Sequence, residues 1–146
     1  MARSKSISER GRVETVIRDF QFRDVDRVVE CLTLNHQYGN PVVDGPAAMT
    51  RVSACPAAVF LVAEVDGAVA GAVRGTYDGS RAIIHQLSVH PAYQRQGIGR
   101  ALVTAIVTRF RAMGAPTTSA TVTEASLPFW QKVGFRRTKA FLVGDW

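Results

Sequence analysis

The sequence predicts a mixed α/β fold of the α+β kind, in which helices flank a mostly antiparallel sheet. Three short runs rich in β-branched residues follow one another with tight-turn signals between them, and two longer runs place apolar residues at helical spacing. The chain has 146 residues, of which 47% are hydrophobic. A chain of this length and composition buries a core as a single domain.

The first third of the chain predicts one strand and two helices. A strand at Thr15–Asp19 comes first, followed by a helix over Phe22–Leu34. A loop at 35–41 leads to a second helix, Asp44–Ser53, which has an aspartate at its N-cap and a proline in its first turn. Pro56 ends this helix.

Three consecutive strands are then expected over Val59–Val65, Val69–Tyr77 and Arg81–Val89. Asp66-Gly67 is a hairpin turn signal, and Asp78-Gly79-Ser80 turns the chain again. Because tight turns join antiparallel neighbours, these strands should form an antiparallel meander.

The last third returns to alternating helices and strands. Arg100, Thr104, Thr108 and Arg111 form one polar face of a helix over Gly97–Met113. The expected order then continues with a strand at Thr117–Thr123, a short helix at Ser126–Val133 and a last strand at Thr138–Val143. The strand after the long helix should run parallel to the strand before it, through a right-handed crossover.

The net charge of +6 is unevenly placed. Residues 1–12 carry four basic side chains against one acidic side chain, so half of the excess lies there. We interpret this segment as a flexible basic tail and residues 13–146 as one domain. No module that reads nucleic acid is visible, so we expect no nucleic-acid partner.

The sequence favours a cytoplasmic protein. No apolar run approaches the roughly 18 residues that a membrane helix needs, so we expect no membrane partner. The first residues lack the apolar region of a secretion signal. Cys31 and Cys55 are the only cysteines, and we expect both to be reduced.

The segment Gln94-Arg95-Gln96-Gly97-Ile98-Gly99 joins the third meander strand to the long helix. The first turn of a helix leaves backbone N–H groups unpaired and carries a partial positive charge. Glycines let a ligand lie against the backbone, so the junction favours a phosphate or pyrophosphate. The pattern is neither a P-loop, since no lysine follows the glycines, nor a dinucleotide fingerprint, since the third glycine is missing.

Gln94, Gly97 and Gly99 fit the pattern [QR]-x-x-G-x-[GA], which resembles motif A of the GNAT acyltransferases. The segment Pro128–Phe135, PFWQKVGF, resembles the FYxKxGF segment of the same family. The two segments occur in the order and at the distance that the family shows, and together they favour the resemblance more than either does alone. The stretch FLVAEVDG…GAVRGTYDGSR is also similar to a subgroup of small bacterial GNAT proteins.

The resemblance implies a sheet of six or seven strands with about four flanking helices, splayed open beside the fourth strand. It implies an N-acetyltransferase that moves the acetyl group of acetyl-CoA to an amine of a small molecule or peptide, by direct attack in a ternary complex and without a metal. Exposed final strands in such folds can pair between subunits, so a homodimer is compatible with it. The alternative is a non-catalytic acyl-CoA-binding or sensing module.

The resemblance also implies which residues contact the cofactor. Backbone amides from Arg95 to Arg100 would hold the diphosphate, and the backbone around Leu87 would polarise the thioester carbonyl and bind pantetheine. The implied cofactor residues are Leu87, Ser88, Val89, Gln94, Arg95, Gln96, Gly97, Ile98, Gly99, Arg100, Ala101, Thr123, Phe129, Trp130 and Lys132.

Two residues are candidates for the base that deprotonates the amine. His85 precedes Val89 by four residues, where family members often carry Glu or His, and strand alternation predicts that residues 85, 87 and 89 share one face. Glu64, on a neighbouring strand, is the rival. A carboxylate near a sheet edge is commonly just solvated, so Glu64 ranks lower.

The chain departs from the family pattern at Trp130, where a tyrosine that protonates the departing thiolate is usual. An indole cannot do this, so either another group such as Tyr93 or Tyr77 serves, or the thiolate leaves unassisted. Thr123 likewise stands where an asparagine is common. The resemblance places the acceptor near the loop that holds His36 and Tyr38, although a plain solvated loop fits those residues equally well.

Overall fold

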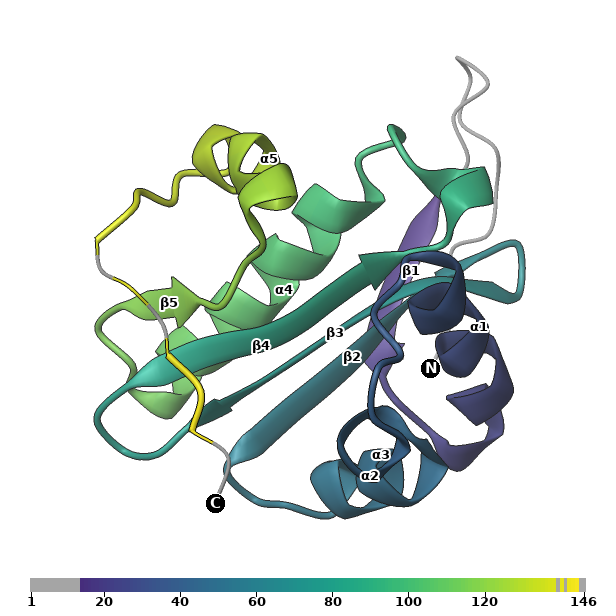
Figure 1. The fold of residues 1–146 in the computed structure, drawn as a ribbon, viewed down its shortest axis with the longest axis horizontal. Coiled ribbons are helices and arrows are strands. Elements are labelled where there is room, and N and C mark those ends of the chain that lie inside the picture. The colour runs from purple at the N-terminus through teal and green to yellow at the C-terminus, as the bar shows by residue number, and fades with distance from the viewer. Residues whose placement is uncertain (1–13, 139, 141, 145–146) are drawn as a thin grey trace.

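The computed structural model describes residues 14–138, 140 and 142–144, so the basic tail expected at 1–12 lies outside the described residues. Its centre is a five-stranded sheet in the order β1-β2-β3-β4-β5 (Figure 1). The strands are β1 (Thr15–Asp19), β2 (Ala58–Val65), β3 (Ala68–Tyr77), β4 (Ala82–Val89) and β5 (Thr118–Ala120). The first four run antiparallel and β5 runs parallel to β4, as the sequence predicts.

Helices cover both faces of this sheet (Figure 1). The α-helices are α1 (Val25–Leu34), α2 (Pro41–Asp44), α3 (Pro46–Ser53), α4 (Ile98–Met113) and α5 (Leu127–Lys132). Short 3-10 turns precede three of them: η1 (Phe22–Asp24), η2 (Pro91–Tyr93) and η3 (Glu124–Ser126). Helix α4 begins after a glycine in the left-handed region, Gly97, and ends at another, Gly114.

Two apolar cores result, because alternate residues of each strand point to opposite faces. On the first face, helices α4 and α5 pack over a core that includes Leu61, Val73, Ile84, Leu102, Ile106 and Phe110. On the second face, α1 and α3 pack over a core that includes Phe20, Val28, Leu32, Met49, Phe60 and Val62. Phe60 and Leu61, neighbours on β2, belong to different cores.

Three expectations about the elements differ from the structure. The sheet of the described residues has five strands rather than six or seven. Of the strand expected at Thr138–Val143, residues 139 and 141 lie outside the described residues, and the described residues there form no strand. The loop expected at 35–41 ends in an extra helix, α2, because Asn40 accepts from the Val42 N–H as an N-cap and Pro41 occupies the first turn.

The pairing of β3 with β4 contains a β-bulge that the sequence does not reveal. Arg74 lies opposite Gln86, but Gly75 lies opposite Ile84, so His85 is an extra residue on β4. A Cβ added at Gly75 would overlap the carbonyl oxygen of Ile83 and lie 3.0 Å from the Cα of Ile84. A glycine is therefore required opposite the bulge.

The pairing of β4 with β5 is short. It covers only Ala82–Thr118, Ile83–Ser119 and Ile84–Ala120, and the Thr121 N–H donates to the Ile84 carbonyl at 3.0 Å. From His85 to Val89, β4 continues, and no strand of the described residues pairs with it on this side. The sheet therefore opens beside its fourth strand.

Two further observations concern membrane-spanning helices and the cysteines. Within residues 14–138, 140 and 142–144, no helix combines the length and the hydropathy needed to span a membrane. Cys31 is buried and Cys55 is exposed, and both are free thiols, as expected.

Candidate active site

The start of α4 presents a run of unpaired backbone N–H groups. Arg95 and Gly97 both have left-handed backbones, with φ of 65° and 84°. The first amide that bonds back along the helix is that of Ala101, which donates to the Gly97 carbonyl at 3.0 Å. The amides of Ile98, Gly99 and Arg100 precede it and have no carbonyl to reach. Alternating left-handed residues gather such N–H groups into a concave, anion-binding nest.

Gly97 and Gly99, the two glycines of this junction, have different surroundings. A Cβ at Gly97 would meet nothing within 4 Å, so the backbone there borders open space. A Cβ at Gly99 would lie 3.1 Å from the ring of Phe129, so Gly99 lets α5 pack closely on the first turn of α4. At Gly99 the ring of Phe129 fills the space that a Cβ would take, while the Gly99 N–H remains part of the unpaired run, so a ligand contact there stays a prediction.

Arg100 and Lys132 add a second link between these helices. The Arg100 guanidinium donates to the Lys132 carbonyl at 3.3 Å, at the C-terminal end of α5. Both residues were implied as cofactor contacts. Their side chains are exposed at the helix junction, close to the amide run.

The open edge of β4 supplies further donors. The His90 N–H donates to the Ala70 carbonyl at 2.7 Å, so His90 faces β3. In an antiparallel ladder alternate residues face alternate sides. Ser88 therefore faces β3 with its backbone, while the backbones of Leu87 and Val89 face the gap. Of the three β4 residues implied in pantetheine binding, Leu87 and Val89 can offer N–H groups there.

The carbonyls of this edge are already taken by side-chain amides. Gln37 donates to the Leu87 carbonyl at 2.9 Å, and Asn35 donates to the Val89 carbonyl at 2.8 Å. Gln94 donates to the Val89 carbonyl at 2.9 Å and to the Asn35 side chain at 3.2 Å. The free groups of the edge are thus donors, which suits the carbonyl oxygens of a ligand.

Asn35 and Gln37 are contributions that sequence reasoning missed. Asn35 also donates to the buried Ser88 hydroxyl at 2.8 Å, so the Ser88 side chain is held away from the gap. Both residues lie just after α1, 50 and 54 positions from their β4 partners. No local pattern marks them, because their role depends on where the loop meets the sheet.

His85 lies beside this edge, but not as strand alternation predicts. Ile84, Leu87 and Val89 all pack toward the α4 core. Ile84 and Leu87 share this face, although they are three positions apart, because the bulge adds His85 between them. The His85 ring instead bonds Thr76, with Nε2 2.9 Å from Oγ1. Thr76 precedes Tyr77, which packs toward the α4 core, so Thr76 faces the α1–α3 side. The expectation that residues 85, 87 and 89 share one face is wrong.

The pKa of His85 lies below its usual value. Partial loss of hydration is the main cause, although the ring is exposed, and the positive charge of Arg74 adds to it. The imidazole is therefore neutral at neutral pH, which is the form that accepts a proton.

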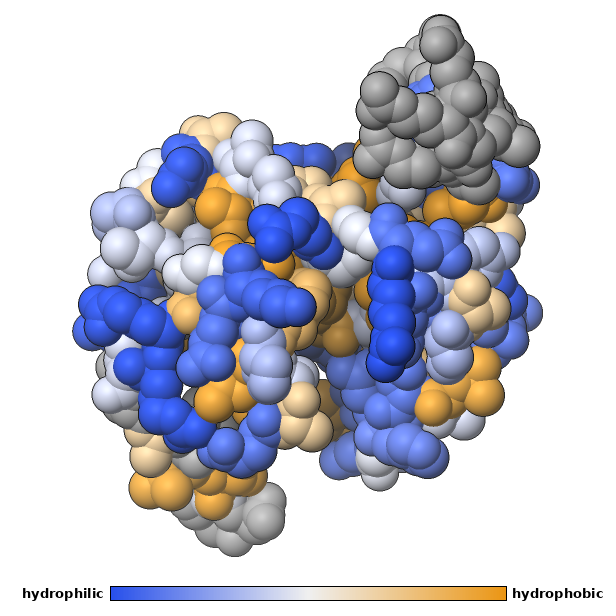
Figure 2. Space-filling model, turned by 90° about the horizontal axis from the view of Figure 1, so that it is seen from above, coloured by the Kyte–Doolittle hydropathy of each residue, from blue (hydrophilic) through white to orange (hydrophobic). Residues whose placement is uncertain are grey.

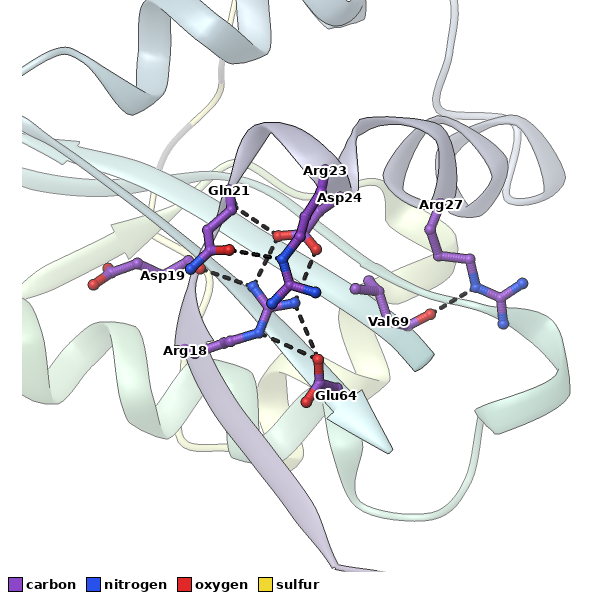
Figure 3. A network of polar contacts seen from close by, with 8 residues as sticks. All are labelled: Arg18, Asp19, Gln21, Arg23, Asp24, Arg27, Glu64 and Val69. Atoms are coloured by element: carbon purple, nitrogen blue, oxygen red, sulfur yellow. Dashed lines mark hydrogen bonds and ion pairs between the residues drawn. The ribbon is translucent and has the colours of Figure 1, made fainter. Parts of the chain in front are cut away.

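Glu64 is not the solvated edge carboxylate that we expected. It is 3% exposed and forms an ion pair with Arg18, with 3.1 Å between Oε2 and Nη2 (Figure 3). Arg18 also bonds both oxygens of Asp24 at 2.8 Å. Glu64 thus belongs to a buried network that joins β1, η1 and β2.

Asp24 is the best-satisfied member of this network. Burial alone would raise its pKa, but hydrogen bonds from Arg18 and from the Gln21 N–H outweigh burial and lower the pKa. The two carboxylates in turn raise the pKa of Arg18 despite its burial. The charged forms of Arg18 and Asp24 are thus favoured in the folded state, so the bonds between them contribute to the stability of the fold.

The two implied acceptor residues have different surroundings. His36 is exposed and has a left-handed backbone, with φ of 57°, directly after the end of α1. Tyr38 is half-buried and packs against the α1–α3 core. A Cβ at Gly45 would lie 3.0 Å from the Tyr38 hydroxyl, so this hydroxyl lies beside the junction of α2 and α3.

The residues after β5 have structural contacts. Trp130 is 5% exposed, and its ring packs edge-on against those of Phe129 and Phe135. The Thr123 hydroxyl caps η3 by accepting from the Ser126 N–H at 3.3 Å. Neither side chain shows a group that titrates near neutral pH.

Two further polar residues have structural partners. His90 caps η2, because its Nδ1 accepts from the Ala92 N–H at 3.1 Å while its Nε2 bonds Glu30 at 3.1 Å. The Tyr77 hydroxyl donates to the Gly79 carbonyl at 3.0 Å, at the closed end of the β4–β5 pair. Tyr77 therefore lies away from the gap and cannot act as an acid there.

The end of the molecule that carries the start of α4 is hollowed. Figure 2 shows a recess on this face with apolar surface at its floor and hydrophilic side chains along its rim. Among the described residues, no group of three or more His, Cys, Asp or Glu side chains could hold a metal ion.

Comparison with known proteins identifies the fold. Residues 26–135 match the model of the acetyltransferase (GNAT) family. The chain belongs to this GNAT family. The match covers well over half of the chain and includes both β4 and α4, which carry the amides described above.

Solved structures agree on the GNAT fold. A transcriptional regulator from Bacillus halodurans C-125 is 22% identical with a TM-score of 0.78, covering 91% of this chain and 100% of that one. The PaiA N-acetyltransferase from Thermoplasma acidophilum, in complex with coenzyme A, is 16% identical with a TM-score of 0.75, covering 88% and 93%. An aminoglycoside acetyltransferase from an uncultured soil metagenomic sample, in complex with sisomicin, is 16% identical with a TM-score of 0.72, covering 90% and 95%. At these identities the likeness shows the fold alone.

Proposed function

We propose that this GNAT protein is an N-acetyltransferase that moves an acetyl group from acetyl-CoA to an amine of a small molecule or peptide. The observation that carries the proposal is the alignment of two donor sets: the unpaired amides at the start of α4 and the donor-only edge of β4 at Leu87 and Val89. Family membership supports it, since the matched region contains both sets.

The residues of the α4 junction fit a pyrophosphate. The amides that precede Ala101 are unpaired, the space at Gly97 is open, and Arg95 and Arg100 add positive charge nearby. Gln94 does not contact the ligand in this proposal. It holds the Val89 carbonyl and so keeps the β4 edge aligned with the helix start.

The β4 edge would orient the reacting carbonyl. Acetyl-CoA would supply the acetyl group as a thioester: the amine nitrogen would form a C–N bond with the carbonyl carbon while the C–S bond breaks and CoA departs as the thiolate. The attacking nitrogen loses a proton as the amide forms, and a proton from water or from this nitrogen converts the thiolate to the thiol. The Leu87 N–H donates to the carbonyl oxygen as negative charge develops on it. Donors of this kind contribute about 3–4 kcal/mol in other acyl transfers.

His85 is the proposed base, with Nδ1 as the atom that takes the proton. Its Nε2 lies 2.9 Å from Thr76 Oγ1. In the tautomer whose Nε2–H donates to this hydroxyl, the lone pair is on Nδ1. An ammonium acceptor must lose one proton before its nitrogen attacks, and His85 Nδ1 accepts it directly or through water. Glu64, paired with Arg18, is a poor rival.

The thiolate needs little assistance in this site. A thiol has a pKa near 8.5, so its conjugate base is a fair leaving group near neutral pH. Trp130 is buried in the α5 core and supplies no acid. Tyr93, half-buried at the end of η2, is the remaining tyrosine near the start of α4.

His36 and Tyr38 stay proposals as acceptor contacts. They follow α1 and lie on either side of Gln37, which bonds the Leu87 carbonyl. The bond of Gln37 supports a role for this short loop at the reacting end of the gap. One structural neighbour, the aminoglycoside acetyltransferase bound to sisomicin, acts on a small molecule, which favours the same acceptor class here.

A screen of amines tests the proposal. The full-length protein is mixed with acetyl-CoA and each member of a panel of small amines, amino acids and peptides with free N-termini, and release of the CoA thiol is measured. We expect time-dependent thiol release that requires the amine, with a product heavier by one acetyl group. Release without an acetylated product would indicate hydrolysis and contradict the proposal.

The second candidate is the non-catalytic sensing module. The buried Trp130 favours it, because the position where the family usually has a titrating tyrosine holds none here. Calorimetric titration with acetyl-CoA, combined with the amine screen, distinguishes the enzyme from the sensing module. Binding without turnover across the whole panel would support the sensing module.

A further inference from the structure

We propose that Arg74 binds the carboxylate of the acceptor, so that this protein selects amines that also carry a carboxylate group, such as amino acids. The inference rests on the proposed acetyltransferase function and adds the class of its second substrate. Four features of Arg74 carry it: its place in the sheet, its unused donors, its only partly compensated charge and the neighbouring carboxylate of Asp44.

Arg74 lies one strand away from the proposed reaction centre. It pairs with Gln86 on β4, between the bulge residue His85 and Leu87. Paired residues of neighbouring antiparallel strands have Cα atoms about 5 Å apart. Arg74 faces the α1–α3 side, as Thr76 does, because Val73 between Ala72 and Arg74 points into the α4 core. Arg74 and the His85 ring therefore lie on the same side of the sheet.

Most donors of the Arg74 guanidinium are unused. One nitrogen, Nη2, donates to the Val43 carbonyl at 3.0 Å. Asp44 Oδ1 is 3.6 Å from the same nitrogen, which is beyond hydrogen-bonding distance, and Oδ1 already accepts from Gln86 at 3.3 Å. Within the described residues, Nε and Nη1 have no acceptor. A guanidinium has five N–H groups, so a flat anion can still bind in a bidentate manner.

These spare donors are reachable from solvent. The Arg74 side chain is 11% exposed. In the described part of the chain, the one fully buried side-chain polar atom without a partner is Oε1 of Gln37. The unused nitrogens of Arg74 are therefore not sealed inside the core, and a small ligand approaching the α1–α3 side can reach them.

The charge of Arg74 is poorly compensated. Burial lowers its pKa, opposed only by Asp44, and one side of its guanidinium lies over the Phe60 ring, 5.9 Å from the centroid. A buried cation with unused donors is stabilised by an anion that fills them. Asp44 limits which anion fits, because its carboxylate would repel a phosphate dianion more strongly than a carboxylate monoanion.

A structural role for Arg74 is the competing explanation. Its bond to the Val43 carbonyl holds α2 against the sheet, so its removal could loosen α2 with no effect on substrate choice. The experiment must therefore compare acceptors that differ only in charge, because a loosened α2 would weaken both equally.

The test uses matched pairs of acceptors, each an amino acid and its amide, with the wild type, Arg74→Gln, Arg74→Lys and the control Arg111→Gln. Arg111 is exposed near the end of α4. We expect wild-type kcat/KM to favour the acid over the amide by about tenfold or more, the size expected for hydrogen bonds to a charged group. Arg74→Gln should bring this ratio near one and leave acetyl-CoA binding unchanged. Arg74→Lys should retain part of the preference, and Arg111→Gln should retain all of it.

An acid-to-amide ratio near one in the wild type, with good turnover of both, would overturn the inference and leave the acetyltransferase function intact. An equal loss on both acceptors in Arg74→Gln would assign Arg74 to α2 packing and also overturn it. A binding arm covers the case without turnover. N-acetylglycine should shift the Arg74 Nε–H resonance while N-acetylglycinamide does not, and the absence of that difference would equally reject the carboxylate site.

Discussion

His85 shows how one inserted residue decides the chemistry of a side chain. The bulge turns its ring toward Thr76 and away from the core that receives Leu87 and Val89. In the proposed tautomer the Nε2–H donates to Thr76, so the lone pair that accepts a proton is on Nδ1. Sequence alternation identified the residue and misplaced its face, because an extra residue on one strand leaves no mark in that strand's own pattern.

Replacing His85 with glutamine should lower kcat by roughly 10²-fold or more, the contribution expected of a general base. In the wild type, kcat/KM should rise as His85 loses its proton and level off above its pKa. That pKa lies below the usual 6.5 or so, so the plateau should already be present at pH 7. Stopped-time assays from pH 5 to 9 measure both effects.

The acetyl-CoA affinity of the His85→Gln variant is the control and should match the wild type. A variant with full activity and an unchanged pH profile would exclude His85. If Glu64→Gln then lost activity while remaining as stable as the wild type, the base would be Glu64.

At the scale of elements, the β3–β4 bulge depends on a single glycine. Gly75 is the residue opposite the insertion, and its missing Cβ makes room for the Ile83 carbonyl. Backbone atoms of a central strand pair cannot move aside as a flexible side chain can. The bulge and the absence of a side chain at 75 are thus one feature.

Gly75→Ala should therefore destabilise the protein by about 2 kcal/mol or more, as overpacking of a tight site does. Urea unfolding measures the change. The matched control is Gly39→Ala, where an added Cβ would meet nothing within 4 Å, and it should change stability by no more than about 0.5 kcal/mol. Equal effects of the two substitutions would contradict the assigned role of Gly75.

Elements with a strong internal pattern were predicted well. Helix α4 begins and ends within one residue of expectation, because its apolar face is long and Gly114 ends it. Helix α2 and the short β5 were harder. Helix α2 has only four residues, too few for periodicity. Strand β5 stops at Ala120, where its pairing with β4 ends at Ile84 although β4 continues to Val89. Sequence runs show β propensity, but pairing decides strand length.

At the scale of the whole molecule, the network of Arg18, Asp24 and Glu64 fastens β1 and η1 to β2. Sequence could not reveal it, because Arg18 and Glu64 are 46 positions apart. The same distance explains why Glu64 looked like a solvated carboxylate. Its role becomes visible only when three elements meet.

Asp24→Asn should cost about 3 kcal/mol at neutral pH, because it removes the charge of a buried carboxylate that pairs with the half-buried Arg18. The pKa of Asp24 is lower in the folded state, so its contribution is complete above the unfolded value of about 3.9 and is lost as pH falls through the folded value. The stability difference between variant and wild type should thus shrink below about pH 4. Urea unfolding at pH 7, 5, 4 and 3 follows it.

The exposed turn residue Asp66 provides the control for acid stability. Asp66→Asn should change stability by less than about 0.5 kcal/mol at every pH. A difference for Asp24→Asn that stayed constant down to pH 3 would mean that its effect is one of packing and not of charge.

The capped carbonyls of β4 have a consequence for the solution behaviour of the protein. A bare sheet margin offers alternating N–H and C=O groups, on which a strand from another molecule can add. Along Leu87 and Val89 the acceptors are already occupied by Asn35, Gln37 and Gln94, so an incoming strand would find half of its bonds missing. Under the proposed function, the edge of β4 can remain accessible to a thioester without favouring the addition of a strand from a second molecule.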